Sequence, residues 1–401
     1  MKYSLRCLLA FVLILTGSIG TAASLNIAND GALRAALKQG VKNKVLVLAP
    51  GVYDPLVLRG DQVPAEIRSA NPQNPAILRG LKISKFDGLR ISGVVFGYAF
   101  NRADKLNVRP FSFADCKNLT LTGNRVQGEL ARGTGTLADG HGYGIGLSVR
   151  FCEDVAITSN HISRHHRGLI VSESDKVNIT NNEVTAIRMD GMTFAQVTNV
   201  RIENNHIHSF KRVLKSKDHS DMIQFWTTST KSASRNITIR GNLLNSGVGA
   251  FTQSIFMRNE LVDMGRAGKE MYYRNLLIEQ NVIINAHLHG ITVGETAGLT
   301  IRNNTLVQNP KSAGGPSGDR VWLPTIRLSD ASTDVAVQNN IQGDISKFKH
   351  HPGWQVSGNL VVVPSQYAKV FAGWPQGDTA NPETFRLRPG VPSVGARRLQ
   401  R

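Results

Sequence analysis

Residues 176–182 read KVNITNN, a segment in which apolar and polar side chains alternate before a closing asparagine. The same pattern recurs at seven other places, from NLTLTGN at 118–124 to DVAVQNN at 334–340. Such alternation is typical of strands that bury one face. The closing residues are Asn124, Asn160, Asn182, Asn205, Asn242, Asn281, Asn304 and Asn340. Three of the steps between them are 22 or 23 residues and the others are longer, so a short period with insertions predicts a β-solenoid.

The recurring asparagines have a structural interpretation. Each coil must turn sharply, and asparagine tolerates the left-handed conformation that sharp turns need. Parallel coils stack about 4.8 Å apart. We therefore expect each amide to bond to the copies above and below it. These residues are predicted to build the fold and to take no part in chemistry.

The ends of the chain have their own signals. Residues 1–23 have the pattern of a secretory signal peptide, with Lys2 and Arg6 before an apolar stretch and small residues at 21–23. No later segment is long and apolar enough to span a membrane, so we expect a secreted or periplasmic protein. The rest should form one domain: a cap at 24–45 with a helix at 28–40, coils over about 46–363, and an irregular cap at 364–401 packed on the last coil.

The formal net charge of +18 over 401 residues indicates an anionic partner. Acidic polysaccharide, nucleic acid and a membrane surface are the candidates. The basic residues are spread along the coils, without a basic amphipathic helix or a long basic run, which disfavours nucleic acid and membranes. A role in solubility alone stays open. We expect a monomer that binds an anionic polysaccharide.

Cys116 and Cys152 each lie eight residues before a recurring asparagine, so they should stack on neighbouring coils. The expected spacing falls within the range of a disulfide. Parallel strands in register orient the two Cβ atoms poorly for the bond. The sequence leaves the pairing open.

Polar residues precede the short apolar strands GIGL at 144, GLIV at 168, GMTF at 191, DMIQ at 221 and GITV at 290. We align these strands, which gives two columns of side chains along one edge. One column contains Tyr143, Arg167, Asp190, Ser220 and His289, and the other contains His141, His165, Arg188, Asp218 and His287. A turn alone needs fewer ionisable groups than this, so the columns predict a site.

The segment KRVLKSKDHSDMIQ at 211–224 lies in one of the insertions and includes Lys215, Lys217, His219 and Asp221. A loop projecting over a rigid scaffold is a common place for a site, although a solvated charged loop is the alternative. Trp226 can stack on a sugar ring or lie in the core. His206 and His208 have a spacing that suits a metal, but no third ligand is evident, so no metal site is predicted.

The chain resembles the pectate-lyase-like superfamily of right-handed parallel β-helix proteins. The resemblance covers nearly the whole mature chain and rests on APGVY at 49–53, the coils described above, and FRLRPGVPSVGA at 385–396. It implies an all-β, single-stranded right-handed parallel β-helix. Within that superfamily the chain is similar in character to exported uronate polysaccharide lyases of the alginate lyase and chondroitinase B type, and to mannuronan C5-epimerases. The run DHSD at 218–221 is similar to the Asp-Pro-His-Asp signature of those epimerases but lacks the proline.

The resemblance implies β-elimination or C5 epimerisation of a uronate polymer. Both reactions remove the C5 proton, which requires neutralisation of the adjacent carboxylate and a base. Arg167 and Arg188 would neutralise the carboxylate, and His219 or His165 would be the base. Lys215 or Lys217 would serve either as neutraliser or as base, and Tyr143 would be the acid. The resemblance leaves Ca²⁺ open as a cofactor. The predicted catalytic residues are Arg167, Arg188, Asp190, Lys215, Lys217, Asp218, His219 and Asp221, and the predicted substrate-binding residues are His141, Tyr143, His165, His287, His289 and Trp226.

Two alternatives remain. A polygalacturonase-type glycoside hydrolase needs two or three carboxylates, for which Asp190, Asp218 and Asp221 would serve. Gly140-His141-Gly142 is similar to that family's Gly-His-Gly, but it lies upstream of the aspartates and not downstream. A non-catalytic protein that binds acidic glycan is the other alternative.

Overall fold

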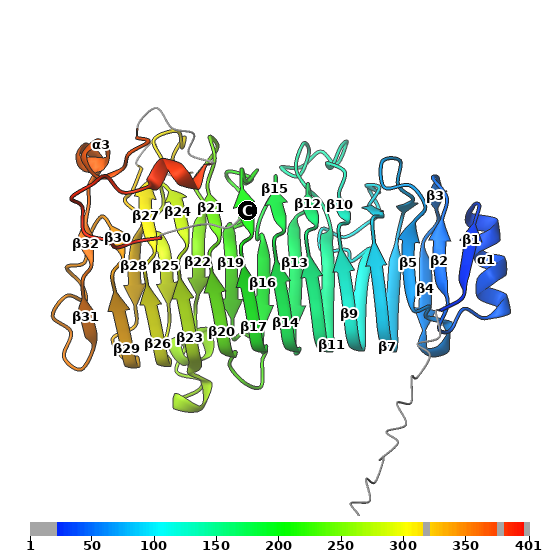
Figure 1. Cartoon of the computed structure of the whole chain (residues 1–401), viewed down its shortest axis with the longest axis horizontal. Coiled ribbons are helices and arrows are strands. Elements are labelled where there is room, and N and C mark those ends of the chain that lie inside the picture. Colours follow the sequence, from blue (N-terminus) through cyan, green and yellow to red (C-terminus); the bar gives the residue numbers. More distant parts are fainter. Residues whose placement is uncertain (1–21, 316–320, 375–380, 397–401) are drawn as a thin grey trace, which may run out of the picture.

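Each coil of the chain contributes strands to three parallel ladders, which stack into an elongated solenoid (Figure 1). The structure is a computed structural model that describes residues 22–315, 321–374 and 381–396. Every pairing between the named strands is parallel, as in β13–β16 and β14–β17. The predicted all-β parallel solenoid is therefore confirmed.

The three ladders follow one another along each coil. Ladder 1 comprises β4 (Leu56–Arg59), the first halves of β7 (Leu81–Ser92), β9 (Phe111–Thr122) and β11 (Ile145–Thr158), then β13 (Arg167–Ser172), β16 (Met192–Ala195), β19 (Asp221–Trp226), β22 (Gln253–Met257), β25 (His289–Val293) and β28 (Thr325–Leu328). Ladder 2 comprises β1 (Ser24–Ile27), β2 (Val45–Leu48), β5 (Glu66–Ser69), the second halves of β7, β9 and β11, then β14 (Asp175–Thr180), β17 (Thr198–Glu203), β20 (Arg235–Arg240), β23 (Tyr273–Glu279), β26 (Thr296–Arg302), β29 (Thr333–Gln338) and β31 (Gln355–Ser357).

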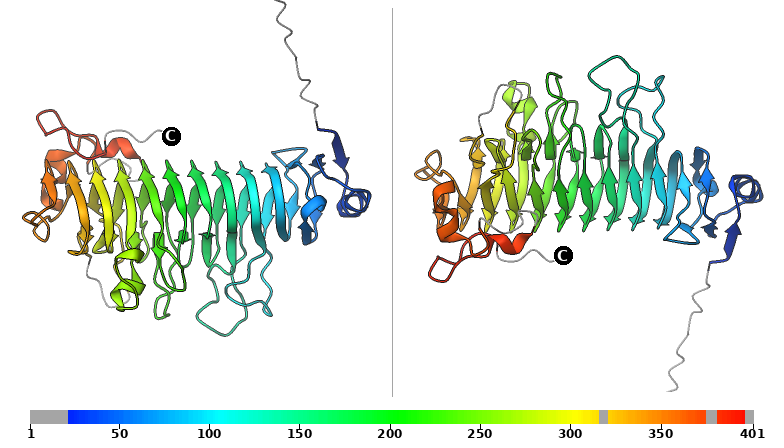
Figure 2. Two further views of the ribbon diagram at one scale, coloured as in Figure 1. Left: turned by 90° about the horizontal axis from the view of Figure 1, so that it is seen from below. Right: turned by 90° about the horizontal axis from the view of Figure 1, so that it is seen from above.

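Ladder 3 has the shortest strands, and loops of varied length connect it to ladder 1 of the next coil. Its strands are β3 (Val52–Tyr53), β6 (Ile77–Leu78), β8 (Val95–Gly97), β10 (Arg125–Gln127), β12 (His161–Ser163), β15 (Glu183–Thr185), β18 (His206–His208), β21 (Leu243–Asn245), β24 (Val282–Asn285), β27 (Thr305–Gln308), β30 (Ile341–Gln342) and β32 (Leu360–Val361). The long loops at 98–110, 128–144 and 209–220 all lie at this corner, along the upper edge in Figure 1. The insertion at 258–272, which includes a short helix, lies instead between ladder 1 and ladder 2, at the lower edge in Figure 1. The insertions thus flank ladder 1, and they project from the same side of the molecule in Figure 2.

The recurring asparagines form a continuous ladder of buried hydrogen bonds. In the central coils, Asn182 donates from its backbone N and its Nδ2 to Oδ1 of Asn205, at 2.9 and 3.0 Å. Asn205 repeats both bonds to Asn242. The predicted stacking is confirmed, but the predicted conformation is wrong. The residue with positive φ is the one before each asparagine, such as Asn181 (57°) and Asn204 (55°).

The helices are few and short. The predicted N-terminal helix is confirmed as α1 (Asp30–Gln39), where the side chain of Asn29 accepts a hydrogen bond from the backbone N of Ala32. It lies beside β1 at the end of the solenoid (Figure 1). The other α-helices are α2 (Glu260–Asp263) and α3 (Tyr367–Val370). No helix among the described residues is long and apolar enough to cross a membrane. The signal peptide predicted at 1–23 lies almost wholly outside the described residues and stays a prediction.

The interior is one apolar column that runs through the coils. Val155, Val177 and Val200 stack in register within ladder 2, and each is almost fully buried. Cys116 and Cys152 also stack in register, and a disulfide joins them across neighbouring coils, with Cα atoms 4.5 Å apart. The structure therefore resolves the pairing that the sequence left open.

The C-terminal segment shares an apolar cluster with Leu360 and Val362 of the last coil, and it also extends over earlier coils. It folds back over the outer face of ladder 3, where Tyr367, Phe371 and Phe385 pack in one cluster with Ile284 and Val307. The outer faces of β21, β24, β27 and β30 are apolar for this reason, because each contributes a residue to that cluster.

Candidate active site

Two buried aspartates occupy neighbouring coils at the corner between ladder 3 and ladder 1. Met192 pairs with Ile223, which places Asp190 beside Asp221, and the backbone N of Gly191 donates to the carbonyl of Asp221 at 2.8 Å. Neither aspartate has any exposed surface. Buried carboxylates require charged or hydrogen-bonding partners, and each of these has one.

Arg167 and His219 are those partners. Arg167 donates from Nε to Oδ2 of Asp190 at 2.9 Å. His219 lies with Nδ1 at 2.9 Å from Oδ2 of Asp221 and at 3.6 Å from Oδ1 of Asp190. When Nδ1 carries the proton that Asp221 accepts, Nε2 keeps its lone pair. The imidazole is thus oriented like that of a general base held by a carboxylate.

The charge of each of these four groups affects the pKa values of its neighbours. Burial, followed by repulsion from Asp221, raises the pKa of Asp190 to about 7. Burial also raises the pKa of Asp221. The hydrogen bond with Asp221 raises the pKa of His219 above its ordinary value of 6.5. The side chain of His219 is 46% exposed and that of Arg167 is 20% exposed, so these two are the members of the cluster that a substrate can reach.

A second ion pair, between Arg188 and Asp218, lies beside the pair of Arg167 and Asp190. Arg188 donates from Nε to Oδ2 of Asp218 at 2.8 Å, and Nε2 of His166 is 3.7 Å from Oδ1 of Asp218. Burial opposes ionisation of Asp218, but the nearby imidazole of His166 and the hydrogen bond from Arg188 outweigh it and hold its pKa well below the usual range. Ser220 is buried and donates to the carbonyl of Arg188 at 3.1 Å. This pair anchors the 209–220 loop and presents His219.

A cationic groove of about 330 Å³ begins at Arg167 and runs over the outer face of ladder 1. Its walls include Arg109 and Arg150, and Trp226 lines it with the ring centroid 5.4 Å from the guanidinium carbon of Arg167. Burial, and then repulsion from Arg150 and Arg167, lowers the pKa of Arg109. Arg150 pairs with Glu173, whereas Arg109 has no ion-pair partner within the described ranges. Three converging guanidinium groups with one carboxylate favour an anionic ligand.

The structure brings six of the eight predicted catalytic residues into these two contacting clusters. They are Arg167, Arg188, Asp190, Asp218, His219 and Asp221. Lys215 and Lys217 are exposed in the same loop. Trp226 lines the groove, consistent with its predicted place at the substrate. The roles of all these residues in binding and chemistry stay predictions.

The structure places the other predicted substrate-binding residues differently. His165 is fully buried, which lowers its pKa to about 4 and rules out contact with a substrate or a role as the base in this conformation. Tyr143 packs edge-on against Phe100 and donates to the carbonyl of Asp104 at 3.0 Å, so its hydroxyl supports a loop. His141 donates from Nδ1 to the carbonyl of Lys211 at 3.0 Å and ties two loops together.

His287 and His289 lie further along the solenoid. Gln253 pairs with Asp221, and Ile291 pairs with Ile255, so His289 is two coils beyond Asp221 in the same column. Burial lowers the pKa of His287 to about 3 and that of His289 to about 4. Both are neutral at physiological pH, and neither belongs to the Asp190 cluster.

The column alignment made from the sequence is partly wrong in register. Arg167 pairs with Ile145 and not with Tyr143. Asp190 lies beside Asp221 and not beside Ser220. The sequence alignment matched Gly191 with Asp221, whereas the pairing of Met192 with Ile223 places Gly191 level with Met222. The alignment also missed Arg109 and Arg150. No repeat position marks either residue, since Arg109 lies in an irregular loop and Arg150 ends a half-strand.

The donor set of the cluster does not suit Ca²⁺. Asp190, His219 and Asp221 each offer a ligand atom within 4.8 Å of the others. Ca²⁺ prefers six to eight oxygen ligands, whereas this set includes an imidazole and has the guanidinium of Arg167 on one carboxylate.

Comparison with known proteins agrees with this architecture. A family model described as "Right handed beta helix region" matches residues 143–341. The chain is a right-handed parallel β-helix protein. No curated protein matches it significantly.

Solved structures share the β-helix at low identity. The Dettilon tailspike protein aligns with a TM-score of 0.54 at 13% identity, over 83% of this chain and 61% of the tailspike. The chain thus spans about three fifths of that protein. An alginate lyase from Paenibacillus sp. str. FPU-7 aligns with a TM-score of 0.47 at 12% identity, over 84% and 99% of the two chains. The A-module of a mannuronan C-5 epimerase from Azotobacter vinelandii aligns with a TM-score of 0.48 at 17% identity, over 84% of this chain and 94% of the module. These likenesses concern the fold alone.

Proposed function

We propose that the protein acts on an anionic, uronate-containing polysaccharide by β-elimination or C5 epimerisation, after export. The observation that carries the proposal is the pairing of an oriented, accessible imidazole with a cationic groove. His219 is held by Asp221 at 2.9 Å, and Arg167 connects this cluster to the groove that also holds Arg109 and Arg150.

These groups match the demands of C5 proton removal. His219 takes the proton through Nε2, and the electron pair left at C5 spreads into the adjacent carboxylate. Arg167 lies where it can neutralise that carboxylate, which is the main electrostatic requirement of the reaction. In elimination the electrons form the C4–C5 double bond and expel the glycosidic oxygen, which takes up a proton. In epimerisation a proton returns to C5 from the opposite face, and the exposed Lys215 and Lys217 are candidates to supply it.

The hydrolase alternative is supported by one observation, the raised pKa of Asp190, which would suit a general acid. Against it, Asp190 and Asp221 are both fully buried behind Arg167 and His219. A glycoside hydrolase needs two carboxyl groups that flank the scissile bond. The accessible groups here are a base and a cation, which suits proton abstraction better.

The test is to incubate the purified protein with alginate, pectate, chondroitin and related polymers, with and without Ca²⁺. Unsaturated uronate is followed by ultraviolet absorbance, C5 exchange by deuterium uptake from D₂O, and chain cleavage by new reducing ends. We expect one of the first two signals. His219→Asn and Arg167→Gln should abolish it, whereas Arg125→Gln, an exposed arginine on ladder 3, should not.

The other outcomes would overturn the proposal. New reducing ends without unsaturation or exchange would assign a hydrolase. Binding that Arg109→Gln weakens, with no turnover on any polymer, would assign a glycan-binding protein.

A further inference from the structure

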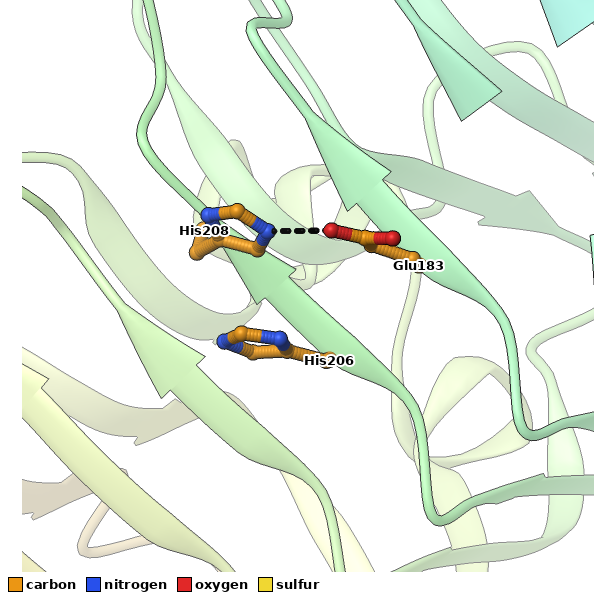
Figure 3. A group of neighbouring side chains, drawn as sticks. All are labelled: Glu183, His206 and His208. Atoms are coloured by element: carbon orange, nitrogen blue, oxygen red, sulfur yellow. Dashed lines mark hydrogen bonds and ion pairs between the residues drawn. The ribbon is translucent and has the colours of Figure 1, made fainter. Parts of the chain in front are cut away.

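A column of ionisable side chains crosses the outer face of ladder 3, on a different sheet from His219. His161, Glu183 and His206 occupy the same position on β12, β15 and β18, where His161 pairs with Glu183 and Glu183 pairs with His206. His208 lies two residues along β18, so it points to the same face. Figure 3 shows Glu183, His206 and His208 around a common point.

The geometry of these three residues is that of a ligand set. One donor atom from each lies within 4.8 Å of the other two. Nε2 of His208 is 3.0 Å from Oε1 of Glu183, and the rings of His206 and His208 stack with centroids 4.0 Å apart. Ligand bonds of about 2.0–2.2 Å in a tetrahedral zinc site put donor atoms roughly 3.3–3.6 Å apart. That separation lies between the 3.0 Å from His208 to Glu183 and the 4.8 Å within which all three donor atoms fall.

Neighbouring groups hold the ligands in place from outside. Nδ1 of His161 is 3.0 Å from Oε2 of Glu183, which leaves Oε1 directed toward His208. Nδ1 of His208 is 3.0 Å from Oγ of Ser209. Outer-sphere partners of this kind fix the orientation and tautomer of metal ligands. With an ion bound at Nε2 of His208, the ring proton would sit on Nδ1 and be donated to Ser209.

The proposed ligands are open to solvent. The side chain of Glu183 is 48% exposed and that of His208 is 20% exposed, so an ion can enter from solvent.

We propose that Glu183, His206 and His208 form a binding site for a divalent transition metal of the Zn²⁺ class, linking two adjacent coils. Two imidazoles and one carboxylate suit Zn²⁺ and its neighbours in the first transition row, whereas Ca²⁺ and Mg²⁺ prefer oxygen. Three protein ligands leave a fourth position for water. The site does not depend on the proposed function, because it lies on another ladder and shares no residue with the groove.

The experiment uses the full mature chain without a polyhistidine tag, stripped of metal with a chelator and titrated with ZnCl₂ by calorimetry. We expect one ion per chain and a rise in Tm on zinc addition. His208→Asn and Glu183→Gln should remove both effects. His161→Gln, which alters only an outer partner, should weaken binding about 10- to 100-fold.

The matched control is His219→Asn, which removes the nitrogen ligand of the other metal-capable group, Asp190, His219 and Asp221. It should bind zinc like the wild type. The proposal is overturned if no zinc binds, if His219→Asn alone abolishes binding, or if equimolar CaCl₂ displaces the zinc. Equal Tm values of metal-free wild type and His208→Asn will show that the variant folds.

Discussion

The orientation of His219 depends on one buried carboxylate. Asp221 accepts its Nδ1 proton and is the largest cause of its raised pKa. We predict that Asp221→Asn lowers the pKa of His219, because the amide keeps the shape but loses the charge. An NMR titration of the His219 ring measures the change, with the exposed His350 as an internal control.

The sign of the pH effects follows from this. A raised pKa in the folded state stabilises the fold at pH values below the unfolded pKa of about 6.5, and the stabilisation is lost as pH rises through the folded value. A base must be neutral, so turnover should fall on acidification through the raised pKa. In Asp221→Asn that acid limb should move to lower pH. An unchanged ring titration would show that Asp221 does not control His219.

Glu183 is the third ligand that the sequence analysis missed, and the repeat pattern contains the signal that could have found it. His161, Glu183 and His206 each directly follow a recurring asparagine, at Asn160, Asn182 and Asn205. The period that predicted the fold therefore also predicts that these three side chains stack. The spacing of His206 and His208 within one strand does not reveal a third ligand, because Glu183 lies on the preceding coil.

The regular strands were predictable from the sequence pattern, whereas the segments between them were not. The alternating pattern fixes which residues of β14 and β17 face inward, because a shift of one residue would expose the apolar set. Loops of varied length carry no such constraint. The predicted column therefore placed Ser220, the last residue of the 209–220 loop, where the structure has Asp221.

The C-terminal segment is the other element that the pattern could not place. Its aromatic residues were predicted to cap the last coil, but their partners also include apolar residues of earlier coils on the outer face of ladder 3, such as Ile284 and Val307. An outward apolar residue on a short strand is easily counted as core. The covering segment lies far away in the sequence, so local periodicity contains no information about it.

Phe371 should control the docking of this segment. It is fully buried, and its ring lies 5.5 Å from that of Phe385 and 5.8 Å from that of Tyr367. A buried Phe→Ala change costs about 3–5 kcal/mol. Because Phe371 lies at the centre of the aromatic contacts that dock this segment, we predict that Phe371→Ala releases it while the solenoid stays folded.

Hydrogen exchange measured by mass spectrometry tests this prediction. Peptides covering 364–374 and 384–396 should lose protection, including the amide of Gly395 that donates to Asn339. Peptides of β13, β16 and β19 should keep theirs. Val361→Ala, at an exposed position of β32, should change neither group. Loss of protection throughout the chain would show instead that the segment supports the whole fold.

For the whole molecule, stability is a sum over coils and the contacts between neighbours, so a defect in the centre should matter most. Asn205 lies in the middle of the asparagine ladder. Asn205→Ala removes the acceptor of the buried backbone N–H of Asn182 and the donor to the carbonyl of Ile179. Each buried group left without a partner costs about 1–3 kcal/mol.

We therefore predict a clear fall in the midpoint of urea unfolding for Asn205→Ala. Asn178→Ala changes an exposed residue of β14 in the coil that precedes β17 and should shift the midpoint little. The disulfide between Cys116 and Cys152 joins two coils on the N-terminal side of the defect, so unfolding of the variant should begin on the C-terminal side. Fluorescence of Trp322 and Trp354 would then change at lower urea than exchange protection in β9 and β11 is lost. Simultaneous loss in both halves would mean that the solenoid unfolds as one cooperative unit, with no boundary at the broken rung.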